Sequence, residues 1–303
     1  MAEFMEDLSK ARKAGLFETT IQFEGNSTYF NPKCEDIKAM ITEIANQMIN
    51  AIKSVSRIFY TPGFHQYVKG IVRDGPVLET MIRGSREYNE ISSEILKKVE
   101  NDFEEAKDKA KDFENVRPIY HFNNTFNYDE YRKQKHSVQN LQDELQKVTT
   151  WVSDLEKMKS KQSCGILEVE ARNLKATLGP ATKEKLDKIK QLVRDLAKKT
   201  CKDYLEDYKT RVGKVIQRPV HLKEFAAQVE VLDELKAGEE RLRAKTKKVE
   251  QMYQLLNKHG VTPPAEDLVQ LDDLRNKQTE YAQQMMEAKS YKDDKMPEMT
   301  QNL

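Results

Sequence analysis

A chain of 303 residues is long enough for two ordinary domains or for one stack of long helices. Charged residues make up 33% of it and hydrophobic residues only 38%, which is less apolar material than a compact globular domain usually carries. The formal net charge is +1, so the composition excludes a global electrostatic attraction to nucleic acid or to an anionic membrane.

Three cysteines, Cys34, Cys164 and Cys201, lie far apart and form no Cys-x-x-Cys pair. The five histidines are equally scattered, so the spacing predicts neither a disulfide framework nor a zinc site. The first residues lack a basic region followed by an apolar stretch, and no apolar run reaches the roughly 20 residues that span a bilayer. We therefore expect a cytoplasmic protein that uses no metal or cofactor and contacts no membrane.

The first sixty residues predict a short helix, a β-hairpin and a long helix. Glu3 to Ala14 has the pattern of an amphipathic helix. Residues 17–23 and 28–30 favour strands around the turn sequence Glu24-Gly25-Asn26. Because a two-stranded hairpin is marginal alone, we expect its apolar side to lie against a helix. Asn31-Pro32 is a good helix start, and the helix after it has apolar residues at every third or fourth position: Ile37, Met40, Ile41, Ile44, Met48, Ile49, Ile52, Val55 and Ile58.

The middle of the chain predicts two helices joined by an aromatic segment. Thr61-Pro62-Gly63 breaks the preceding pattern, and a charged helix runs from Tyr88 to about Asn115. Arg117-Pro118 predicts its end. The aromatic residues that follow suit a packed connection, which leads into a helix from about Tyr128 to Lys161.

The last part predicts a closing helical hairpin. Residues 166–169 favour a short extended piece, and Gly179-Pro180 predicts a break before a helix that ends at Arg218-Pro219. Apolar residues then recur at helical spacing from Leu222 to Leu256 and again from Leu268 to Met285. The breaker His-Gly-Val-Thr-Pro-Pro between these two patterns indicates that the two helices run antiparallel.

Together these elements predict a mainly α protein, an elongated stack of long antiparallel helices arranged as helical bundles, with one small β-hairpin near the amino terminus. We expect three segments. Residues 1–60 hold the short helix, hairpin and long helix, and residues 61–164 form a helical bundle segment with the aromatic connection. Residues 165–303 form a helical bundle that ends in the long helical hairpin.

No pattern for catalysis accompanies these helices. Gly213-Lys214 lacks the preceding glycine of a phosphate-binding loop. Acidic groups such as Asp102 with Glu104 and Glu105 lie in charge-dense helical stretches and fit solvated helix faces. The basic run at residues 241–248 has no interleaved aromatics and follows two glutamates, so it does not favour nucleic-acid binding. We predict no catalytic, cofactor-binding or metal-binding residue.

Aromatic side chains are the candidates for partner binding, because they supply large contact area at low entropic cost. The same residues would equally suit a hydrophobic core. The candidates are Tyr120, Phe122, Phe126, Tyr128, Tyr131 and Trp151.

Three stretches of the chain resemble a known family. They are residues 21–32 with the isoleucine-rich helix after them, Gly165 to Val169 preceding Leu174 to Leu178, and residues 252–261. In this order they resemble the tail of an axonemal (ciliary or flagellar) dynein heavy chain, in the region just before the linker and motor. The resemblance extends from about Leu16 to Lys289, and the last stretch is its most specific part.

The resemblance implies a non-catalytic tail segment of an ATP-driven microtubule motor in the axoneme. It implies assembly with dynein intermediate chains, light chains and neighbouring heavy chains, with microtubule contact only indirect through the complex. The family's nucleotide-binding and microtubule-binding elements have no counterpart here, so no catalytic residue is carried over. The alternative is an independent spectrin-like or coiled-coil cytoskeletal scaffold, and a membrane-sculpting helical dimer is a third class.

Overall fold

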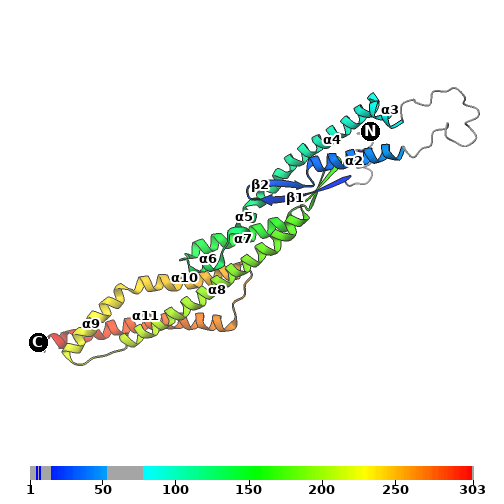
Figure 1. The fold of residues 1–303 in the computed structure, drawn as a ribbon. Coiled ribbons are helices and arrows are strands. Elements are labelled where there is room, and N and C mark those ends of the chain that lie inside the picture. Colours follow the sequence, from blue (N-terminus) through cyan, green and yellow to red (C-terminus); the bar gives the residue numbers. More distant parts are fainter. Residues whose placement is uncertain (1–4, 6, 8–14, 53–77, 302–303) are drawn as a thin grey trace, which may run out of the picture. The chain divides into compact units, whose positions relative to one another are not determined.

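The computed structural model describes residues 5, 7, 15–52 and 78–301, which divide into two compact units. The first unit consists of residues 1–126 and 151–182, and the second of residues 127–150 and 183–303. The mainly α fold predicted from the sequence is confirmed, and the strands lie in the first unit (Figure 1). Each unit combines two separate stretches of the sequence, whereas each of the three predicted segments is one continuous stretch. The division into those three segments stays a prediction.

Some sequence predictions lie outside the described residues. They are the helix over Glu3 to Ala14, apart from Met5 and Asp7, the breaker at Thr61-Pro62-Gly63, and the end of the long helix near Ile58.

The first unit contains a four-stranded sheet in the order β2-β1-β4-β3. Strands β1 (Phe17–Glu24) and β2 (Ser27–Asn31) pair antiparallel, which confirms the predicted hairpin. Strands β3 (Lys161–Cys164) and β4 (Leu167–Glu170) form a second antiparallel pair, and β4 confirms the predicted extended piece. The expectation that the apolar side of this hairpin lies against a helix is confirmed, because Ile21 and Phe23 share a core with Ile37 of the helix that follows. Strand β1 also pairs parallel with β4, with Phe17 opposite Leu167, because main-chain hydrogen bonds complete the free edge of each hairpin.

Helices make up the rest of the first unit. They are α2 (Cys34–Ile52), α3 (Leu78–Gly84), α4 (Arg86–Ala110), the 3₁₀ helix η2 (Lys111–Val116) and α5 (Arg117–Thr125), with parts of α7 (Val138–Lys157) and α8 (Arg172–Val215). The predicted long helix after Pro32 and the predicted charged helix are α2 and α4. Pro118 does not lead into an irregular connection. It lies in the first turn of α5, where a missing N–H costs nothing.

The core of the first unit joins the sheet to the helices. Thr19, Ile21 and Phe23 alternate along β1 with exposed residues and point inward, as a half-buried strand requires. Their neighbours come from α2, α4, α5 and β4, and include Ile37, Val99, Phe103, Ile119, Leu167 and Val169. Phe103 on α4 packs edge-on against Phe30 on β2, with 5.9 Å between ring centroids.

The second unit consists of helices in its described residues. It contains α6 (Tyr128–Lys133), the first part of α7, most of α8, α9 (Leu222–Ala237), α10 (Glu239–Lys258) and α11 (Ala265–Gln301). The predicted helix over 128–161 is split, because α6 ends at Lys133 and α7 begins at Val138. The predicted helix over 222–256 is likewise divided at Gly238.

The predicted break at Gly179-Pro180 is wrong, because α8 continues through both residues. An interior proline costs a helix about 3 kcal/mol. Pro180 itself is exposed, while Leu178 and Thr182 on either side are buried, so the helix keeps its packed face across the proline. Tertiary packing therefore outweighs the local preference.

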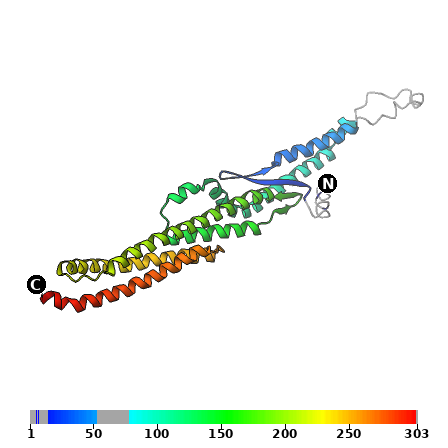
Figure 2. The same ribbon diagram turned by 90° about the horizontal axis from the view of Figure 1, so that it is seen from below.

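The closing antiparallel hairpin is confirmed. Helix α11 runs back along α10 and α9 (Figures 1 and 2). The Arg275 guanidinium contacts Glu250 of α10 at 2.8 Å, and further along α11 Lys292 contacts Asp233 of α9 at 3.1 Å. The buried Tyr281 hydroxyl donates to the Leu235 carbonyl at 3.4 Å. Its ring meets Tyr208 of α8 with 5.7 Å between centroids, so α8, α9 and α11 share one core.

Candidate interaction surfaces

The described part of the chain contains no group of three or more His, Cys, Asp or Glu side chains placed to hold a metal ion. Within the same residues, no helix combines the length and the apolar content needed to cross a membrane. The three cysteines are free thiols, and burial raises the pKa of Cys201 to about 11. That thiol stays protonated near neutral pH and is a poor nucleophile.

The six predicted partner-binding aromatics are all half-buried, but they belong to two different units. In the first unit, Phe122 lies 4.9 Å from Phe126 and 5.3 Å from Trp151, measured between ring centroids. Tyr120 points to the sheet, where its ring meets Phe23 edge-on at 5.7 Å. Phe122, Phe126 and Trp151 therefore form one group of tilted rings, while Tyr120 belongs to the edge of the core.

Tyr128 and Tyr131 lie on α6 in the second unit. Helix α6 begins because the Asn127 side chain accepts hydrogen bonds from the amides of Asp129 and Glu130. The Tyr131 ring packs on His136 with 4.4 Å between centroids. Burial, with a smaller contribution from Glu144, raises the pKa of Tyr131 to about 12, so this side chain is a neutral hydroxyl.

Asp102 is a buried carboxylate, so the prediction that it lies on a solvated helix face is wrong. Its neighbours Glu104 and Glu105 are exposed as predicted, but Asp102 is only 3% exposed. Its Oδ2 accepts the amide of Ile166 at 2.9 Å, and its Oδ1 lies 3.0 Å from Lys98 Nζ. The carboxylate thereby holds the β3–β4 turn against α4, which is a structural role.

Gly165 in that turn is required by geometry. Its φ is +57°, and a Cβ at this position would lie 2.3 Å from Asp102 Oδ2. The sequence Ser163-Cys164-Gly165 is compatible with a turn, because glycine readily takes a positive φ. The Asp102 carboxylate beneath that turn is seen only in the structure.

A second buried carboxylate, Asp267, stands at the beginning of α11. Its Oδ2 accepts from Arg194 Nε at 3.2 Å, and its Oδ1 lies 3.2 Å from Lys198 Nζ; both cations belong to α8. Asp267 therefore anchors the start of α11 to α8. No sequence signal distinguished it from the surrounding acidic residues.

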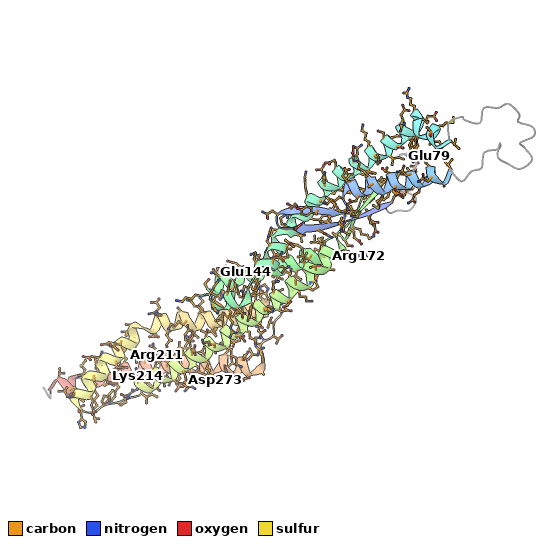
Figure 3. All side chains as sticks on the ribbon, in the orientation of Figure 1. Glu79, Glu144, Arg172, Arg211, Lys214 and Asp273 are labelled. Carbon is orange, nitrogen blue, oxygen red and sulfur yellow. The ribbon has the colours of Figure 1, made fainter. Side chains whose placement is uncertain are left out.

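Many surface charges form short-range pairs along single helices. Arg211 on α8 donates to Asp207 at 2.8 Å, and Figure 3 shows Arg211 near Lys214 on the same helix. Such pairs contribute only a few tenths of a kcal/mol each. They explain the charge density without implying a site.

The described residues of the second unit form grooves between their helices. One, of about 740 Å³, lies between the beginning of α7, the middle of α8 and the carboxyl-terminal half of α10. Another, of about 260 Å³, lies between α11 and the α9–α10 pair, and Met285 and Met286 are among its lining residues. Neither was predicted from the sequence, because each needs helices that are far apart along the chain.

The fold and these contacts thus define a mainly helical protein whose buried carboxylates hold its elements together. Comparison with known proteins makes this specific. Residues 172–303, from α8 to the end of α11, match the family model described as dynein axonemal heavy chain 2/5/8 coiled-coil. Over 261 residues, 83% of the chain, the sequence is 22% identical to human dynein axonemal heavy chain 6.

These two matches confirm the resemblance of the sequence to axonemal dynein heavy chains. The chain spans about 6% of the length of the human relative. The matched model is that of a coiled-coil region and not of an ATPase motor domain.

Proposed function

We propose that this chain is a non-catalytic structural segment of the tail of an axonemal dynein heavy chain, just before the linker. In this role it helps assemble an ATP-driven microtubule motor complex of the ciliary or flagellar axoneme. The observation that carries the proposal is the coiled-coil family match over α8 to α11, which are the helices that make up most of the second unit.

The proposed partners are dynein intermediate chains, light chains and neighbouring heavy chains. The group of Phe122, Phe126 and Trp151 and the pair Tyr128 and Tyr131 support association, because each of these aromatic side chains is only half-buried. Contact with the microtubule would be indirect, through the complex. No nucleic acid or membrane partner is proposed, in keeping with the net charge of +1.

Affinity capture from a ciliary extract, with mass spectrometry of the retained proteins, tests this assignment. The test variant is Tyr128→Glu with Tyr131→Glu, and the control is Tyr29→Glu, an exposed tyrosine on β2. We expect the wild type and the control to retain dynein intermediate or light chains and the test variant to retain much less. Circular dichroism checks that all three proteins keep their helices.

Two results would contradict the proposal. Retention of actin-linked proteins alone would favour a spectrin-like scaffold. ATP turnover by the purified chain that a point substitution abolishes would show an enzyme instead.

A further inference from the structure

The larger groove of the second unit, called here the α7–α8–α10 groove, has an apolar floor. Leu141 of α7 and Met252 and Leu255 of α10 line it and are 1%, 6% and 5% exposed. Leu196 of α8, which is half-buried, completes the floor. Its volume of about 740 Å³ falls in the range typical of ligand-binding clefts.

The groove carries positive charge and no negative charge. Its ionisable lining residues are Lys248, Lys258, Tyr204 and His136, and none of the lining residues is Asp or Glu. This is unusual in a chain with 50 acidic residues among 303. Asp143, which follows the lining residue Gln142 along α7, does not line the groove and accepts a hydrogen bond from the Gln139 side-chain amide at 2.8 Å.

The two lysines have no partner of opposite charge within the described residues. Both are exposed, and neither forms an ion pair there, whereas Glu250 on the same helix pairs with Arg275. The helix cannot supply a partner either. The positions three and four residues before and after Lys248 are Ala244, Lys245, Gln251 and Met252, and those before Lys258 are Gln254 and Leu255.

The rim between the lysines is polar but neutral. Gln139 and Gln142 on α7 face the groove from one side, and Gln251 and Gln254 on α10 from another. An apolar centre with a polar rim is the usual anatomy of a protein–protein interface. Two lysines are too few for a nucleic-acid backbone, whose binding uses a longer row of cations.

From this combination we infer that the α7–α8–α10 groove docks an acidic amphipathic helix of a partner polypeptide. Aliphatic side chains of that helix, three and four residues apart, lie on Leu141, Leu196, Met252 and Leu255. Its Asp or Glu side chains face Lys248 and Lys258. The inference goes beyond the proposed function, because it names a surface separate from the six aromatic candidates and the chemistry of its occupant.

Binding of a synthetic probe to the full chain tests the inference. The probe is a fluorescent helical peptide with Leu at positions three and four apart and Glu on both flanks, and a matched peptide carries Lys in place of every Glu. Fluorescence anisotropy should show saturable binding of the acidic probe that weakens as salt is added, and at least about tenfold weaker binding of the basic peptide.

Two sets of variants locate the site. Lys248→Glu with Lys258→Glu should weaken acidic-probe binding by about tenfold or more. Lys223→Glu with Lys247→Glu changes the same charge at exposed lysines outside the groove and should leave binding within about twofold. Leu196→Gln should also weaken binding, because it makes the floor polar. Thermal unfolding of each variant verifies that it is folded.

Several outcomes would overturn the inference. They are no saturable binding of the acidic probe, equal losses in the two lysine pairs, or competition by anionic phosphatidylserine vesicles or polyphosphate as effective as that by the unlabelled peptide. Because the readout is a purified chain with a synthetic peptide, failure here is separate from failure to retain dynein subunits from an extract.

Discussion

The two units of this molecule reach a packed core by different routes. The second unit is built from long helices whose apolar stripes are visible in the sequence. The first depends on a sheet in which residues 17–20 pair with residues 167–170, and on a carboxylate beneath a glycine turn. Periodic local patterns thus suffice to specify helices, while the first unit also needs contacts between distant segments that no local pattern encodes.

We expect the largest effect from a core substitution that destabilises the first unit and leaves the second unit unchanged. Phe103→Ala removes a side chain that is 2% exposed and packs between α4 and the sheet, so it should lower the free energy of unfolding of the first unit by about 3–5 kcal/mol. Hydrogen exchange followed by mass spectrometry should then show faster exchange in α2, α4 and the sheet. Helices α9 to α11 should keep their protection.

Ile91→Ala on the same helix is the control, because Ile91 is 39% exposed and its truncation should be nearly neutral. Equal loss of protection in both units after Phe103→Ala would contradict this prediction, because it would show that the two units unfold together as one cooperative unit.

The glycine turn gives the next largest effect. Gly165→Ala places a Cβ 2.3 Å from the Asp102 carboxylate at a positive φ, and should destabilise the first unit by about 2–4 kcal/mol. Urea unfolding monitored by circular dichroism measures this loss. Gly179→Ala is the matched control, since nothing lies within 4 Å of a Cβ there and alanine favours the helix. If Gly165→Ala left the free energy of unfolding unchanged, the close approach of Gly165 to Asp102 would not matter for stability.

In the second unit, the corresponding buried carboxylate should matter less. Asp267→Asn keeps the shape but removes the charge that faces Arg194 and Lys198. Because those cations are 40% and 39% exposed and stay partly solvated, we expect a loss of about 1–2 kcal/mol. Thermal melting of the variant beside Asp273→Asn, an exposed position on the same helix, measures the difference (Figure 3). Equal melting temperatures of the two variants would show that the charge of Asp267 does not stabilise the start of α11.

The smallest effect is a pH dependence at the end of α10. Burial, with Lys258 and Lys190 nearby, lowers the pKa of His259 below its ordinary value of about 6.5. The unfolded chain then binds a proton more readily than the folded one. The stabilising contribution of neutral His259 is complete above about pH 6.5 and falls as the pH drops toward the folded-state pKa.

Urea midpoints at pH 7.5 and 5.5 measure this contribution. The decrease should be smaller in His259→Gln, whose amide can still reach Thr149, the partner of His259 Nδ1 at 3.3 Å. An identical pH dependence in both proteins would assign the decrease to other groups.

Local sequence patterns predicted some elements of this protein correctly and others wrongly. Local periodicity located α2, α4 and the α10–α11 hairpin, because apolar residues three and four apart mark one helix face. The local pattern was misleading at Pro180, where the buried residues Leu178 and Thr182 keep the helix intact. It was also misleading at Asp102, which is buried although Glu104 and Glu105 are exposed. The six aromatic candidates were found by residue type, but their division between two units was not.

The sequence by itself therefore determined the helical class, the hairpin of β1 and β2, and the resemblance to axonemal dynein heavy chains. Each of these depends on short-range spacing or on the order of elements. Only the tertiary structure decided the parallel pairing of β1 with β4, the burial of Asp102 and Asp267, and the α7–α8–α10 groove. These features join residues that lie far apart along the chain, and such pairings leave no periodic pattern in a single sequence.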